Sequence, residues 1–141
     1  MAQVGSGTVP KTAKLYLYLN ALLYIIFGAW CALDPTWTAQ AVGFSLPGNQ
    51  GLAEFVAVYG GLEFGVGVFF LLCARSFSFQ LKYAGVLFGA CFYTGICIFR
   101  TFAIAQVGFD IGAGINFYIS ECVLTLWSLI LLSKFPSSPK A

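Results

Sequence analysis

Residues 51–74 read GLAEFVAVYGGLEFGVGVFFLLCA, an apolar run that only two ionisable residues interrupt, Glu54 and Glu63. The run is longer than the ~20 residues that a helix needs to cross a ~30 Å hydrocarbon layer. Three further runs of similar length and composition lie at residues 15–33, 83–105 and 112–132. The four runs predict four transmembrane helices.

The composition of the whole chain favours the same class of protein. Of the 141 residues, 60% are hydrophobic and 9% are charged, and the mean hydropathy is +0.88. A soluble domain carries about 25% charged residues, so this chain could not cover its surface with solvated groups. We therefore expect an all-α, polytopic membrane protein. Its four-helix bundle occupies residues 11–134 in the lipid bilayer, between a disordered tail at residues 1–10 and a polar tail at residues 135–141.

The basic residues predict the orientation of this bundle. All of them except Arg100 precede the first run, follow the fourth, or lie between the second and the third. The other two connections carry Asp34 and Asp110 instead. By the positive-inside rule, both termini are cytoplasmic. The compact form suits a bacterial inner membrane.

Several kinds of chemistry are excluded by composition. The chain has no histidine, which rules out a Ser-His or Cys-His nucleophile pair and a His-bearing zinc site. Its five cysteines are scattered without a C-x-x-C motif, which argues against a thiol redox relay or an iron–sulfur site. The net charge of +2 is too small for a nucleic-acid surface. We expect no metal, no cofactor and no catalytic residue.

Three ionisable residues lie well inside the apolar runs: Glu63, Arg100 and Glu121. Each costs at least ~2.5 kcal/mol in a membrane if it is left unpaired. A rise of ~1.5 Å per residue puts Arg100 roughly 8 Å, Glu121 roughly 13 Å and Glu63 roughly 18 Å from the outer end of its run. Because side chains lean toward the N-terminus of their helix, an Arg100–Glu121 pair is within reach. Glu63 needs a longer reach, and Glu54 is the least expected member of the cluster.

Two interpretations of these residues stay open. Arg100 and Glu121 form either a structural staple or a ligand, ion or proton site that opens outward. Two carboxylates around one guanidinium leave an excess of negative charge, so we expect Glu63 to carry a proton. Three tyrosines share helix faces with the charged residues and complete the candidate site: Tyr59, Tyr93 and Tyr118.

Two G-x-x-x-G motifs indicate close helix packing. Gly61 and Gly65 form one in the second run, and Gly85 and Gly89 form the other in the third run. Small residues at this spacing let helix backbones approach closely in lipid. We expect them to face a neighbour within the bundle, because a short loop joins these two helices. A second copy of the chain is the alternative.

The segment AEFVAVYGGLEFGVGVFFLL (residues 53–72) resembles the signature of a small four-helix membrane family, domain of unknown function 4345. Gly95 with Arg100, the turn from Gly108 to Asp110 and the mid-helix Glu121 are similar to that family's pattern. One departure is Phe99, since the family's pattern has glycine directly before the arginine. The resemblance covers nearly the whole chain and implies a four-helix bundle without an assigned activity.

Three functions therefore compete. The first is a binding or transport protein in which Arg100 holds a small anionic ligand or lipid, Glu121 orients Arg100, and Glu63 exchanges a proton. The second is an accessory or assembly subunit that docks another membrane protein or a second copy of itself. The third is a membrane-embedded enzyme acting on a lipid or quinone, with Glu63, Glu121 or a tyrosine as acid or base. The lack of a cofactor motif makes the enzyme the weakest of the three.

Overall fold

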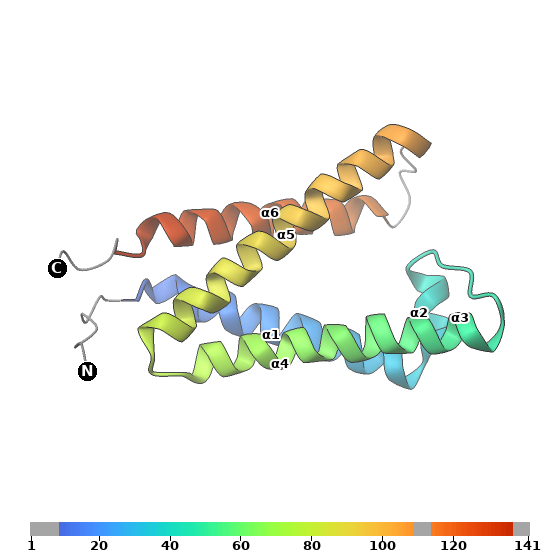
Figure 1. Ribbon diagram of the computed structural model, residues 1–141, viewed down its shortest axis with the longest axis horizontal. Coiled ribbons are helices and arrows are strands. Elements are labelled where there is room, and N and C mark those ends of the chain that lie inside the picture. The colour runs from blue at the N-terminus through green and yellow to red at the C-terminus, as the bar shows by residue number, and fades with distance from the viewer. Residues whose placement is uncertain (1–8, 109–113, 137–141) are drawn as a thin grey trace.

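The computed structural model describes residues 9–108 and 114–136, and every regular element in these two ranges is a helix (Figure 1). Four helical stretches are long and apolar enough to cross a membrane: Lys11–Leu33, Gly48–Arg75, Phe79–Val107 and Ile115–Lys134. This confirms the predicted all-helical fold with four spans. The first span begins and the fourth span ends at the same end of the bundle, which we call the terminal end; the opposite end is the far end.

The elements follow one another with short connections. Helix α1 (Lys11–Leu33) leads into the short α2 (Pro35–Ala41). Asp34 caps the N-terminus of α2, because its side chain accepts a hydrogen bond from the backbone nitrogen of Trp37. The second span consists of α3 (Gly48–Phe55), the π-helix η1 (Val56–Leu62) and α4 (Glu63–Arg75). Helices α5 (Phe79–Val107) and α6 (Gly114–Lys134) complete the bundle.

Helices α1 and α4 lie antiparallel and very close together (Figure 1). A Cβ atom added at Gly28 would lie 2.6 Å from the backbone nitrogen of Phe64 and 2.8 Å from the carbonyl oxygen of Gly60. One added at Gly67 would lie 2.7 Å from the backbone nitrogen of Ile25. Only glycine permits this backbone contact, so these positions fix the spacing of the α1–α4 pair.

The second span changes its helical geometry just before Glu63. Over Val56–Leu62 the backbone forms a π-helix, a rare geometry with i→i+5 hydrogen bonds that is often found at functional sites. This wider turn rotates the residues that follow relative to an uninterrupted α-helix. Glu63 is the first residue of the α-helix that resumes, so η1 sets the direction in which its side chain leaves the span.

The larger of the two hydrophobic clusters in the described residues lies in the terminal half of the bundle, where all four spans meet. Its largest fully buried side chains come from every span, and the principal ones are Tyr16, Leu17, Phe70, Val86, Tyr93 and Leu131. Phe135, just after α6, closes this end against Phe79 and Tyr83 with ring centroids 5.5 and 5.3 Å away. Close packing here holds α5 and α6 onto the α1–α4 pair.

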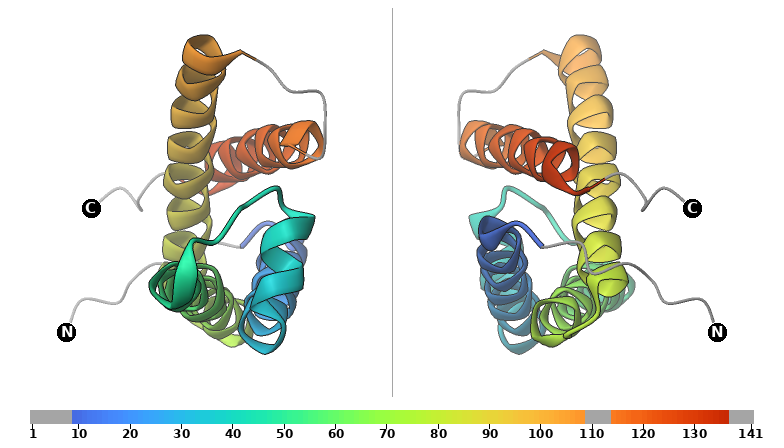
Figure 2. Two further views of the ribbon diagram at one scale, coloured as in Figure 1. Left: turned by 90° about the vertical axis from the view of Figure 1, so that its right-hand side faces the viewer. Right: turned by 90° about the vertical axis from the view of Figure 1, so that its left-hand side faces the viewer.

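Toward the far end, α5 and α6 diverge from the other two spans (Figures 1 and 2). Gly85 and Gly89 let α5 approach α1 closely in the terminal half, where added Cβ atoms would collide with Leu17 and Tyr16. Farther along α5, Phe92 packs against Tyr24 of α1 with ring centroids 5.7 Å apart, and beyond this contact the two helices diverge. The last turns of α5 are consequently exposed, as the 74% exposure of Phe99 shows.

Candidate functional site

Arg100 of α5 and Glu121 of α6 form an ion pair in the far half of the bundle. Nε of Arg100 donates to Oε2 of Glu121 at 2.7 Å, and Nη2 donates to Oε1 at 2.7 Å. Two parallel, charge-assisted bonds of this kind fix both the distance and the orientation of the groups. The pair lies on the surface between the diverging helices, with the Arg100 side chain 37% exposed and the Glu121 side chain 13% exposed.

Hydroxyl groups on both helices flank the ion pair. The hydroxyls of Thr101 and Tyr118 lie 2.9 Å apart and form a second hydrogen bond between α5 and α6. Thr125 donates to the carbonyl oxygen of Glu121 at 2.8 Å, one helical turn away. Tyr118, which the sequence placed in the candidate site, therefore lies beside Arg100 in the structure.

Glu63 does not join this pair. Among the described residues, the ion pair of Arg100 involves Glu121 alone, and Oε2 of Glu63 is buried without a hydrogen-bond partner. The expected cluster of three buried charges is thus not formed in the described part of the chain. The prediction compared only the depths of these residues along their helices. It did not include the sideways divergence of α5 and α6 from α4, the helix that carries Glu63.

Neither of the other two candidate tyrosines, Tyr59 and Tyr93, forms a hydrogen bond with Arg100 among the described residues. Tyr93 is 2% exposed, and its hydroxyl donates to Oδ1 of Asn20 on α1. Asn20 in turn donates to the carbonyl oxygen of Tyr16 at 2.8 Å, so this polar group is satisfied inside the core. Tyr59 stacks on Phe55 with ring centroids 4.8 Å apart. Tyr93 joins α5 to α1, and Tyr59 belongs to an aromatic group at the far end.

The two G-x-x-x-G motifs differ in their surroundings. Gly85 lies against Cys73 and Leu17, and Gly89 lies against Tyr16, as the expectation of packing within the bundle requires. A Cβ added at Gly65 would meet no described atom within 4 Å, and one at Gly61 would meet only a backbone oxygen at 4.0 Å. Within the described residues, Gly61 and Gly65 therefore do not make the helix contact that was predicted for them. Gly60 and Gly67 on the adjacent face make those contacts instead, because they point at α1.

The structure also brings together a pair of thiols that no sequence motif connects. Sγ of Cys97 on α5 lies 3.7 Å from Sγ of Cys122 on α6 and 3.5 Å from the hydroxyl of Thr125. The two cysteines are 25 residues apart in the sequence. Their proximity depends on how α5 and α6 align along each other, which no spacing motif records.

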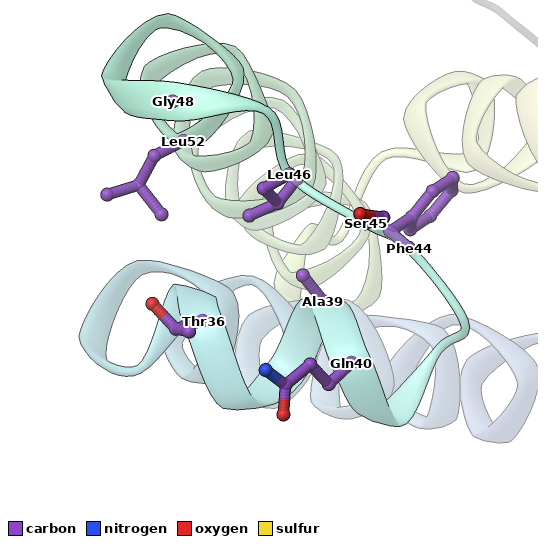
Figure 3. Close-up of a pocket in the computed structure, with 8 residues that line it drawn as sticks. All are labelled: Thr36, Ala39, Gln40, Phe44, Ser45, Leu46, Gly48 and Leu52. Carbon is purple, nitrogen blue, oxygen red and sulfur yellow. The ribbon is translucent and has the colours of Figure 1, made fainter.

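A cavity of about 430 Å³ lies away from these charged residues, between α2, the following loop and α3. Thr36 and Gln40 project from α2, and Leu46 and Leu52 lie on the opposite wall (Figure 3). All eight lining residues are uncharged. This lining offers no counter-charge for an anion, so we place the candidate site at Arg100 instead.

Comparisons with known proteins give no indication of function. No family model matches the chain, and no curated protein or solved structure matches it either. The resemblance to domain of unknown function 4345 stays a prediction from the sequence motifs.

Proposed function

We propose that the chain is a membrane-embedded binding module that holds an anionic group at Arg100. The group belongs either to a small anion or to a lipid headgroup, and its chemistry is that of a carboxylate or phosphate oxygen. A protein with four membrane spans would also be able to transport that ligand across the membrane.

The hydrogen-bond donors of Arg100 that have no partner among the described residues carry the proposal. A guanidinium has five N–H donors, and Glu121 occupies two of them. The remaining three lie on a side chain that is 37% exposed within a span long enough to cross a membrane. Polar groups in a bilayer need partners, because lipid tails offer none. An anionic oxygen at the free edge of Arg100 would satisfy these donors.

The neighbouring groups have roles that follow from their contacts. Glu121 holds Arg100 side-on and so directs the free edge of the guanidinium away from α6. Tyr118 and Thr101 brace the two helices beside it. We assign proton exchange to Glu63, because one of its oxygens is buried without a partner among the described residues.

The predicted orientation completes the proposal. Basic residues flank the terminal end, where α1 begins and α6 ends, and the positive-inside rule places that end in the cytoplasm. Arg100 would then face the outer leaflet, and a bacterial inner membrane would be the setting.

A thermal-shift experiment tests this function on the full chain, purified in detergent and stripped of lipid. Phosphatidylglycerol and inorganic phosphate are the two anionic probes, and zwitterionic phosphatidylcholine is the control lipid. We expect at least one anionic probe to raise the unfolding midpoint, since a ligand stabilises the folded state that it binds. A response to phosphatidylglycerol alone identifies a lipid headgroup, and a response to phosphate identifies a small anion.

The matched variants in this experiment are Arg100→Lys and Arg75→Lys, which change the two arginines of the chain one at a time. A lysine keeps the charge but cannot reproduce the planar fork of donors. Arg100→Lys should clearly reduce the rise in midpoint, and Arg75→Lys should keep it. A wild-type midpoint that neither anion raises, or an equal rise in Arg100→Lys, overturns the proposal.

An accessory subunit is the second candidate, and one observation favours it. The far half of α5 exposes large apolar side chains beside Arg100, including Ile98, Phe99 and Phe102. In that case the Arg100–Glu121 pair is a structural staple, and a partner helix covers this face. Co-purification of one defined membrane protein in mild detergent, lost in Phe99→Ala, would support this function over ligand binding.

A further inference from the structure

The cysteines of the chain fall into two groups in the structure. Cys31 and Cys73 are buried in separate clusters, and Cys91 is exposed on its own. Cys97 and Cys122 are partly exposed and face each other across α5 and α6, with their sulfur atoms 3.7 Å apart. Two sulfur atoms at this separation are already in contact, so a bond between them needs only a local adjustment of the two side chains and helices.

We infer that Cys97 and Cys122 form a dithiol site that an external disulfide oxidises to an intramolecular disulfide. A disulfide requires an S–S distance of about 2.05 Å. The sulfurs must approach by about 1.6 Å, which side-chain rotation and a small movement of α6 can share.

The reaction is a thiol–disulfide exchange in two steps. The thiolate of one cysteine attacks the oxidant's disulfide, forms a mixed disulfide and releases the first thiol of the oxidant. The thiolate of the other cysteine then attacks the protein sulfur of that mixed disulfide and releases the second thiol. The two protons lost by the cysteines end on the two released thiols. The protein is oxidised by two electrons, and the oxidant is reduced by two.

Oxidation of this cysteine pair would affect the Arg100–Glu121 ion pair, because the two pairs are neighbours on α5 and α6. Cys97 precedes Arg100 by three residues on α5, and Cys122 directly follows Glu121 on α6. A covalent link there fixes the separation of α5 and α6 beside the ion pair. Under the predicted orientation the site lies toward the non-cytoplasmic side, where disulfides form and persist. The inference does not depend on ligand binding by Arg100.

The test uses 2,2′-dithiodipyridine, a small apolar disulfide, on the full chain in detergent. Attack by an isolated cysteine leaves a pyridylthio adduct on the protein, whereas a close pair eliminates that adduct. We expect mass spectrometry of wild type to show a Cys97–Cys122 cross-link and no adduct on either residue. Separate stable adducts on Cys97 and Cys122, or two thiols that stay unmodified while Cys91 reacts, would overturn the inference.

Two variants and a second readout sharpen this experiment. Cys122→Ser should carry a stable adduct on Cys97, and Cys91→Ser should form the cross-link as wild type does. If Cys122→Ser does not fold, the peptide map of wild type still decides between a cross-link and two adducts.

The oxidised wild-type protein should also unfold at a higher temperature than the reduced protein, because the link constrains the unfolded chain. Reduction with dithiothreitol should reverse that rise, and an unchanged midpoint would count against a cross-link within the fold.

Discussion

Arg100 binds Glu121 side-on, through Nε and Nη2, with both hydrogen bonds 2.7 Å long. This relationship between α5 and α6 is compatible with two roles, a structural staple and a preoriented anion site. The two roles differ in what happens at the edge of the guanidinium that Glu121 leaves free. Stability measurements report on the first role, and binding measurements report on the second.

The ion pair should contribute measurably to stability. We expect Arg100→Gln and Glu121→Gln each to lower the free energy of unfolding by about 1–2 kcal/mol, between the values for exposed and buried ion pairs. The double variant should cost less than the sum of the single variants, because either change already breaks the pair. Denaturant titration in one detergent measures all three, with Arg75→Gln as the control. Strictly additive costs would show that the two side chains do not interact in solution.

Glu63 should behave in the opposite way to Glu121. Its Oε2 is buried without a partner in the described residues, so Glu63→Gln removes a carboxylate that gains little from its surroundings. We expect an unfolding midpoint equal to that of wild type or higher, as is common where a functional group reduces stability. A midpoint lowered as far as in Glu121→Gln would mean that Glu63 has a structural partner.

The hydrogen bond between Tyr93 and Asn20 should stabilise the contact of α5 with α1. Tyr93→Phe removes the donor and leaves Oδ1 of Asn20 buried without a partner, which costs about 1–3 kcal/mol. Tyr83→Phe is the matched control, because Tyr83 lies on the same helix with its side chain exposed. The unfolding free energies of the two variants give the comparison. Equal values would show that the Asn20 contact adds nothing to stability.

Two glycines in the α1–α4 region should respond very differently to alanine. Gly28→Ala places a methyl group 2.6 Å from the backbone of Phe64 and must push the helices apart, so we expect a loss above about 2 kcal/mol. Gly65→Ala meets no described atom within 4 Å and should gain up to about 1 kcal/mol from helix propensity. Thermal midpoints measure both changes, and size-exclusion chromatography shows whether Gly65→Ala alters the oligomeric state. A change of oligomeric state there would indicate that Gly65 faces a second copy.

The four spans and the Arg100–Glu121 pair could be predicted from the sequence, because each depends on features of a single helix. Span positions follow from runs of apolar residues, and the pair follows from depth and from the lean of side chains toward the helix N-terminus. The absence of Glu63 from that pair could not be predicted, because it depends on the divergence of α5 and α6 from α4. That divergence begins where Phe92 packs against Tyr24, residues distant in the sequence, and no local pattern records such a contact.

The glycine and cysteine contacts show the same limit. Gly61 and Gly65 match the G-x-x-x-G spacing, yet Gly60 and Gly67 face α1, and a π-helix in the same span changes the rotation of the helix. Cys97 and Cys122 meet because of how α5 and α6 align, although they are 25 residues apart. A spacing motif records residues that share one helix face. It carries no information about which partner that face meets.

The most direct test of an anion site at Arg100 is the dissociation constant of phosphatidylglycerol, measured by native mass spectrometry on the delipidated protein. Loss of the bidentate fork in Arg100→Lys should weaken binding about tenfold or more, while Arg75→Lys should bind as wild type does. Binding of phosphatidylglycerol to Arg100→Lys with the wild-type dissociation constant would contradict the site.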